Sequence, residues 1–190
     1  MGGLRERKKL RTRTELMTTA IRLFAEHGFD QVTVDDVAAA AGVSPRTFFR
    51  YFDSKAAAVF GNTSILLEGL QRALAERPAG VSTIAAFTEY WLREAQIVYD
   101  HPDAYHAQHE LAAQHTHVAA ERSRTFDRMR TVMIDALQAE DPRRPLVEVE
   151  MLGSMMASTI FTALRVWHEH GGDPRRILRD CMRAVERAAG

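Results

Sequence analysis

The sequence predicts an all-α protein, because three observations agree on helices and none indicates a sheet. Apolar side chains recur every three or four residues through most of the chain, as on the buried face of a helix. Residues that begin or end helices, chiefly glycine and proline, separate these periodic stretches. No stretch alternates apolar and polar residues as a half-exposed strand would. We therefore expect about nine helices, in an N-terminal domain over residues 1–53 and a C-terminal domain over residues 54–190.

The composition bounds the class of protein. Apolar residues make up 46% of the 190 residues, which is enough for a core and too many for a disordered chain. The single cysteine, Cys181, cannot form an internal disulfide, in agreement with a reducing compartment. The N-terminus lacks an apolar signal-peptide core, and no run approaches the length that spans a membrane. We therefore expect a cytoplasmic protein without membrane contact.

Charge is distributed unevenly, although the formal net charge is zero. Residues 1–60 contain 10 lysines and arginines against 7 acidic residues, whereas residues 61–190 contain 15 against 18. Six of the first 13 residues are basic. A basic N-terminal third indicates that this end meets phosphate. Residues 1–10 are then either a solvated tail or an arm that follows the DNA backbone or enters the minor groove.

Two helices are predicted before residue 42. The first, over residues 12–27, carries apolar side chains on one side and ends at Gly28. The second begins at Thr33, because Thr33 and Asp36 have the spacing of a capping box.

A turn and a third helix follow. Gly42 adopts the left-handed conformation of a turn at low cost, and Ser44 followed by Pro45 begins the helix. Phe48 and Phe52 are four apart and face inward. The outer face carries Arg46, Thr47 and Arg50. This arrangement is typical of the helix-turn-helix, whose second helix enters the major groove of DNA, although the same shape occurs in proteins that never bind DNA.

The segment from about Arg13 to Val59 resembles the TetR family of bacterial transcriptional regulators. The matching landmarks are AIRLFAEHGF, TVDDVAAAAGVS and TFFRYFDSK, which span three helices in register. The family usually has tyrosine at the position of Phe49, so a hydroxyl contact to phosphate is missing here, and it often has an acidic residue after the equivalent of Lys55. The resemblance implies a homodimeric, ligand-responsive regulator, and a repressor in particular, that binds a palindromic operator in double-stranded DNA.

The third helix would then read bases while its surroundings hold phosphates. Arg46 and Thr47 would meet base edges. Phosphates would be held by Thr33, Ser44, Tyr51, Lys55 and the amides after Ser54. The complete set of residues expected at the DNA is Thr33, Ser44, Pro45, Arg46, Thr47, Phe49, Arg50, Tyr51 and Lys55.

Six further helices are predicted after the helix-turn-helix, over residues 54–76, 82–99, 102–113, 116–139, 146–170 and from 174 onward. Gly61, inside the first of these, either permits close packing or softens the connection between the domains. Aromatic and methionine side chains in this half could line a pocket for an unknown small-molecule effector, although such side chains more often form plain core. The candidates are Phe87, Trp91, Tyr105, His109, Met151 and Met155.

The last two helices are the predicted dimer interface. The helix over residues 146–170 is apolar on more than one face, and the last helix carries an apolar stripe. A partner chain would bury both, whereas a central core helix of a monomer is the alternative.

Metal binding and catalysis are not expected. His106, His109 and Glu110 have the spacing of metal ligands, but solvated or pocket-edge histidines explain them better. No ordering of nucleophile, base and acid and no phosphate loop is present in the sequence, so we expect no enzyme, metal or cofactor. Two other classes stay open: a helix-turn-helix protein without an effector, and a small metal-binding helical protein.

Overall fold

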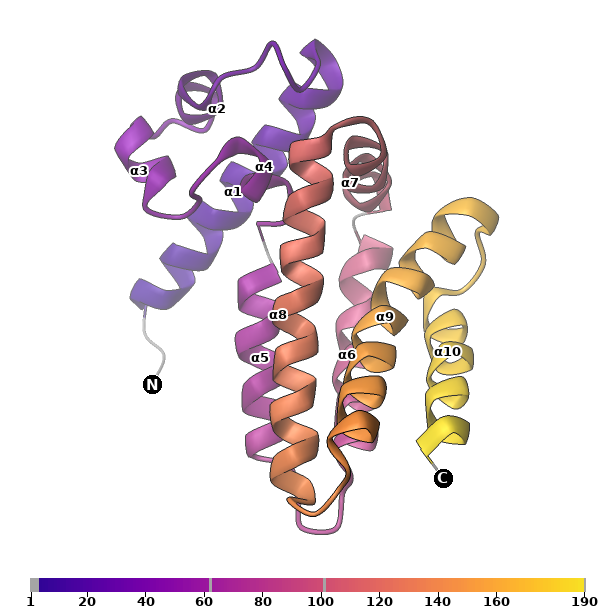
Figure 1. The fold of residues 1–190 in the computed structure, drawn as a ribbon. Coiled ribbons are helices and arrows are strands. Elements are labelled where there is room, and N and C mark those ends of the chain that lie inside the picture. Colours follow the sequence, from indigo (N-terminus) through magenta and orange to yellow (C-terminus); the bar gives the residue numbers. More distant parts are fainter. Residues whose placement is uncertain (1–3, 62, 101, 190) are drawn as a thin grey trace. The chain divides into compact units, whose positions relative to one another are not determined.

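The computed structural model describes residues 4–61, 63–100 and 102–189, and within these ranges the chain forms ten helices and no strand (Figure 1). The predicted all-α class is therefore confirmed. The helices are α1 Leu4–His27, α2 Val34–Ala40, α3 Pro45–Phe49, α4 Lys55–Val59, α5 Thr63–Ala75, α6 Thr83–Asp100, α7 Pro102–Gln114, α8 Thr116–Glu140, α9 Leu146–His170 and α10 Pro174–Ala189.

The chain divides into two compact units, whose boundaries differ from the one expected after residue 53. The first unit comprises the residues up to Ser64 together with His106–Arg122, which include most of α7 and the start of α8. The second comprises Ile65–Tyr105 and the residues from Ser123 onward. The assignment of DNA binding and effector binding to separate parts of the chain stays a prediction.

Helix α1 begins at Leu4, eight residues before the start expected at residue 12. Leu4–Leu10, expected as a basic tail or arm, is therefore part of α1, while residues 1–3 lie outside the described part of the chain. The reason is local: arginine, lysine, leucine and glutamate are good helix formers, and no glycine or proline separates them from the rest of α1.

The single helix expected over residues 54–76 is two helices, α4 and α5. A Cβ atom on Gly61 would lie 2.8 Å from Cβ of Met17, so the chain here passes against α1 at a distance that only glycine allows. The Nε group of Arg13 also donates to the carbonyl oxygen of Gly61. Gly61 therefore permits close packing, which is one of the two roles considered for it. It also lies between α4 and α5, and this division raises the number of helices from the expected nine to ten.

The second unit has a continuous apolar core formed by α5, α6, α8, α9 and α10. Helix α10 buries its apolar stripe, which includes Leu178, Met182 and Val185, against α9 and α6 of the same chain. The hydroxyl of Tyr90 on α6 donates to the carbonyl oxygen of Leu66 on α5 at 2.6 Å. Most of the stripe of α10 is thus covered within the chain, while Ile177 and Cys181 on the same helix are only partly buried. The expected dimer interface through α9 and α10 stays a prediction.

Helix α9 is the one helix among the described residues that is long and apolar enough to cross a membrane by length and composition. The sequence predicts no run of this length, because charged residues at both ends of α9 obscure its apolar centre. Eight of its residues, among them Val149, Met156 and Ile160, are buried inside the chain. Burial of this kind is typical of the core helix of a globular protein, which passes the same test.

Candidate nucleic-acid interface

The turn between α2 and α3 has the geometry of a helix-turn-helix. Gly42 has a φ of +67°, the left-handed region that favours glycine. The amide of Gly42 donates to the carbonyl of Ala39 at 3.0 Å, and the amide of Val43 donates to that of Ala38 at 2.9 Å. These two bonds close the end of α2 and turn the chain toward α3. Ala38 is fully buried, and its small side chain lets the two helices approach.

Helix α2 begins with the predicted capping box. The Thr33 hydroxyl accepts from the amide of Asp36 at 3.1 Å, while the Asp36 carboxylate accepts from the Thr33 amide at 2.8 Å and hydroxyl at 2.6 Å. These bonds from Thr33, led by the one from its hydroxyl, hold the pKa of Asp36 below its ordinary value of 3.8, and His27 adds a smaller lowering. The Thr33 hydroxyl expected at a phosphate is therefore occupied by the cap.

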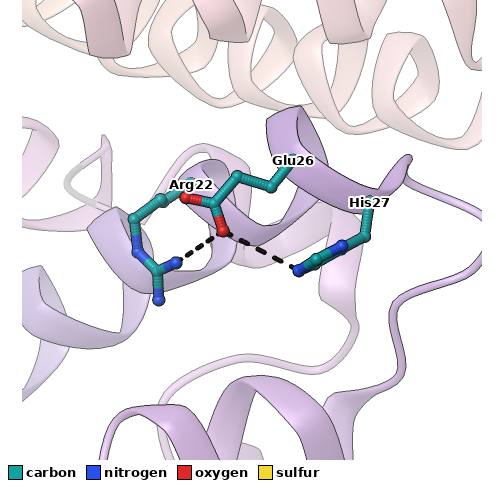
Figure 2. A network of polar contacts seen from close by, with 3 residues as sticks. All are labelled: Arg22, Glu26 and His27. Atoms are coloured by element: carbon teal, nitrogen blue, oxygen red, sulfur yellow. Dashed lines mark hydrogen bonds and ion pairs between the residues drawn. The ribbon is translucent and has the colours of Figure 1, made fainter.

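Polar side chains also cluster near this point, at the end of α1. Figure 2 shows Glu26 between Arg22 and His27, with Arg22 Nη1 at 2.7 Å and His27 Nε2 at 3.8 Å from the same carboxylate oxygen. All three side chains are about half exposed. Exposed pairs of this kind contribute about 0.2–1 kcal/mol at most, so the cluster stabilises the helix end modestly and carries no chemistry.

Helix α3 is held by a cap and one buried anchor. The Ser44 hydroxyl accepts from the amide of Thr47 at 3.2 Å and lies 3.0 Å from the Thr47 hydroxyl. Pro45 occupies the first helical position, where a missing N–H costs nothing. Phe48 is fully buried and contacts Phe52, with ring centroids 5.5 Å apart. The anchor fixes which side of α3 faces outward.

The outward side of α3 carries two arginines flanked by a phenyl ring and a hydroxyl. At 3.6 residues per turn, Arg46 and Arg50 lie opposite the buried Phe48, with Phe49 on one side and Thr47 on the other. Arg46, Phe49 and Arg50 are exposed, and the guanidinium of Arg50 lies 5.2 Å from the ring centroid of Tyr51. Five of the residues expected at the DNA, Arg46, Thr47, Phe49, Arg50 and Tyr51, are thus brought together on and directly after α3.

Lys55 is engaged inside the unit. Its ammonium donates to the carbonyl oxygens of Phe29 at 2.6 Å and Val32 at 3.0 Å, and it lies 4.4 Å from the ring centroid of Phe29. The ring of Phe29 in turn stacks on His115 at a centroid distance of 4.8 Å. Lys55 is expected at a phosphate from the sequence. These contacts are not predicted there, since no local pattern relates residues so far apart in the chain.

The six ligand candidates lie in different surroundings. Phe87 and Trp91 are buried in the core of the second unit, and Met155 packs against that core. His109 belongs to the first unit. Met151 has an exposed fraction of 61%, so it lies at the surface; the sequence pattern could not place it, because α9 is apolar on several faces.

Two further observations concern possible ligands in the second unit. Burial, with a smaller effect of Glu94, raises the pKa of Tyr105 to about 12, so its phenol stays a neutral hydrogen-bond donor. The Nε1 donor of Trp91 is buried and has no acceptor among the described residues. The described residues also contain no group of three or more His, Cys, Asp or Glu side chains placed to hold a metal ion.

Comparison with known proteins gives the family of the helix-turn-helix. Residues 16–59 match the family model described as bacterial regulatory proteins, tetR family. The regulator TcmR of Streptomyces glaucescens is 42% identical over 86 residues, which cover 45% of this chain and 38% of TcmR. The chain thus spans less than half the length of that relative. The repressor KstR2 of Rhodococcus jostii is 27% identical over 84% of this chain and 81% of its own length.

The fold of the whole chain also has a counterpart among solved structures. The Thermus thermophilus FadR, a TetR family repressor in complex with lauroyl-CoA, aligns with a TM-score of 0.63 and 22% identity over 92% of this chain and 93% of FadR. At this identity the likeness concerns the fold. Residues 16–59 are therefore similar to the tetR family of bacterial regulatory proteins, and the whole chain shares the fold of a TetR family repressor.

Proposed function

We propose that this chain is a sequence-specific DNA-binding transcriptional regulator, in which a small molecule bound by the second unit releases DNA. The observation that carries the proposal is the outward side of α3, where Arg46 and Arg50 stand opposite a fully buried anchor on a capped helix-turn-helix. A helix presented in this way places donors at the base edges of the major groove. The similarity to KstR2, named as a repressor, supports repression.

Selection of bound duplexes from a random pool tests DNA binding. We expect one enriched, palindromic sequence, because two copies of α3 in a dimer would read half-sites about 34 Å apart. Arg46→Ala should weaken binding to that sequence by about 1–3 kcal/mol and relax the preference at one base pair. Arg176→Ala, an exposed arginine on α10, is the matched control and should leave binding unchanged. Equal weakening of selected and scrambled duplexes by Arg46→Ala would make Arg46 a phosphate contact instead.

The effector would bind in the second unit and would carry a hydrogen-bond acceptor. The support is the buried Nε1 group of Trp91, because an unpaired buried donor costs about 1–3 kcal/mol that an acceptor on a ligand would recover. Phe87, next to Trp91 at a ring-centroid distance of 6.3 Å, would supply an apolar wall. FadR is described with lauroyl-CoA, and a thioester of this kind offers both an apolar chain and acceptor oxygens.

Release of the selected duplex by added compounds tests the effector, and lauroyl-CoA is the first probe. Trp91→Phe, which removes the donor and keeps an aromatic ring, should reduce the response to an active compound by about tenfold or more and leave DNA affinity unchanged. A chemically varied panel that never releases the duplex would favour the alternative, a helix-turn-helix regulator without an effector. A metal-binding role has no support from the placement of the described side chains.

We infer that the regulator is a homodimer, joined through the exposed side of α9. Leu146, Val147 and Met151 on that side have exposed fractions of 66%, 70% and 61%, which is unusual for large apolar side chains. Leu178, Met182 and Val185 of α10 are covered within the chain, so α10 would contribute less apolar surface than α9. We also propose that the protein is not an enzyme and that it acts in the cytoplasm, where its operator would lie.

A further inference from the structure

Phe49 is the one large apolar side chain of the first unit that is strongly exposed, among the residues whose side chains the structure describes. Its exposed fraction is 54%, whereas the preceding Phe48 is fully buried. A phenyl ring left in water forgoes the stabilisation that burial would give. The ring also cannot donate to or accept from a phosphate, so charge recognition does not explain it.

The ring occupies a defined place on the outward side of α3. Phe49 is three residues after Arg46, so the two side chains are neighbours on the helix surface. Its ring centroid lies 5.7 Å from that of Phe48, with an angle of 84° between the planes. This edge-to-face contact with a buried neighbour favours the orientation in which the ring is found. An apolar group therefore stands beside the arginine that is proposed to read a base.

We propose that Phe49 contacts the 5-methyl group of a thymine and thereby selects thymine at one position of each half-site. The methyl group of thymine is the apolar feature that base edges present in the major groove. Arg46 and Thr47 can supply the polar part of the readout, and a phenyl ring beside them adds a contact that cytosine and the purines do not offer. This inference rests on the proposed DNA binding. Packing of the ring on a deoxyribose, which would be neutral to sequence, is the competing outcome.

The geometry also locates the thymine. Side chains three apart on a helix lie about 5–6 Å from one another at Cβ, and base pairs are spaced about 3.4 Å along the duplex. The thymine selected by Phe49 should therefore lie within about two base pairs of the position at which Arg46→Ala relaxes the preference.

The experiment replaces each thymine of the selected duplex, one at a time, by deoxyuridine, which removes only the methyl group. Equilibrium binding is measured for the wild-type protein, Phe49→Ala and Phe49→Tyr. For the wild type, one replacement per half-site should weaken binding by about fourfold, the effect of leaving one methyl-sized contact unmade. Phe49→Ala should bind the thymine and deoxyuridine duplexes equally. Phe49→Tyr, which keeps the ring, should retain the preference for the methyl group.

The outcomes separate this inference from the proposed function. If the random pool yields no enriched duplex, DNA binding itself fails and the inference falls with it. If a duplex is enriched but no deoxyuridine replacement weakens the wild type, or if Phe49→Ala keeps the methyl preference, only the inference is overturned. The deoxyuridine replacements measured with the wild-type protein alone show whether any thymine methyl group is recognised. That part of the test therefore remains valid even if a Phe49 variant folds poorly.

Discussion

The ammonium of Lys55 lies 2.6 Å from the carbonyl oxygen of Phe29, and this bond ties the first residue of α4 to the loop between α1 and α2. Val32 provides a second carbonyl at 3.0 Å, and the ring of Phe29 lies beneath the charge. The sequence interpretation assigned Lys55 to a DNA phosphate. An amine that already has two carbonyl acceptors gains less from a phosphate than a free one, so we expect its main contribution to be to stability.

Replacing Lys55 by methionine tests this role, because methionine keeps most of the apolar stem and removes the charge. The free energy of unfolding should fall by about 1–3 kcal/mol, since two carbonyls lose a charged donor. Urea denaturation measures the change. Lys9→Met, at an exposed position on α1, is the control and should change stability by less than about 0.5 kcal/mol. A stable Lys55→Met variant with a weaker dependence of DNA binding on salt would restore the phosphate role.

The capping box of α2 should make stability depend on pH. The pKa of Asp36 is depressed in the folded protein, so its contribution is fully present above its ordinary value of 3.8 and is lost as the pH falls through the folded value. Asp36→Ala should therefore lower the Tm at pH 7, and the difference from the wild type should shrink below about pH 3.8. Asp35→Ala keeps the capping box and should have a smaller effect at neutral pH. Equal losses in both variants would contradict the role of the box.

DNA binding should depend on salt through the first turns of α1. Lys8 and Lys9 are exposed on this helix, and each phosphate that a lysine neutralises contributes a slope of about −0.9 in log K against log salt concentration. The double variant Lys8→Ala, Lys9→Ala should reduce the slope by up to about two units. The control is a second double variant, Arg176→Ala with Arg179→Ala, which removes two exposed positive charges from α10. It should leave the slope unchanged. If both pairs change it equally, the effect is one of overall charge.

Helix α9 should tolerate no side chain at Gly153. A Cβ atom there would lie 2.7 Å from Cγ1 of Ile134 on α8, a distance at which the Ile134 side chain or one of the two helices must shift. Gly153→Ala should destabilise the protein by about 1–3 kcal/mol, reduced by up to about 1 kcal/mol because alanine favours helix. In an Ile134→Ala background the same substitution should cost less, since the clashing atom is gone. Thermal unfolding of the two single variants and the double variant measures these costs. If the losses of the two single variants simply add up in the double variant, the contact between Gly153 and Ile134 is not the cause of the destabilisation.

The dimer should depend on the exposed side of α9. Met151→Glu places a charge among exposed apolar side chains and should shift sedimentation at micromolar concentration toward the 21.4 kDa monomer. Arg183→Glu on the outer side of α10 makes a larger change in charge at an exposed site and should leave the dimer largely intact. A wild-type protein that sediments as a monomer would overturn the proposed interface.

The features that the sequence predicted well depend on neighbouring residues. The capping box of Thr33, the turn at Gly42 and the start of α3 at Ser44 each follow from side chains within four residues of one another. The apolar stripes were also visible, but their partners were not. Periodicity shows that the last helix has an apolar face and cannot show that α9 and α6 of the same chain cover it.

The long-range contacts could not be predicted. The carbonyl acceptors of Lys55 lie 26 and 23 residues earlier in the chain, and His115 stacks on Phe29 from the corner between α7 and α8. Backbone carbonyls carry no sequence signal, so a lysine that binds them reads as an ordinary surface cation. The same limit applies to Met151, because an apolar residue on a largely apolar helix gives no indication of which side is covered.

The contribution of His106–Arg122 to the first unit has a consequence for how such a protein can be recombined. The chain passes between the units at Ser64, at Tyr105 and at Arg122, so no single cut separates them. A fragment that ends soon after the helix-turn-helix would lack the His115 ring that covers Phe29 and the Gln108 side chain that donates to the carbonyl of Val59 at 2.7 Å. The helix-turn-helix is therefore not expected to fold as an independent domain. A chimaera that exchanges operator specificity between relatives must include the end of α7 and the start of α8 together with α1 to α4.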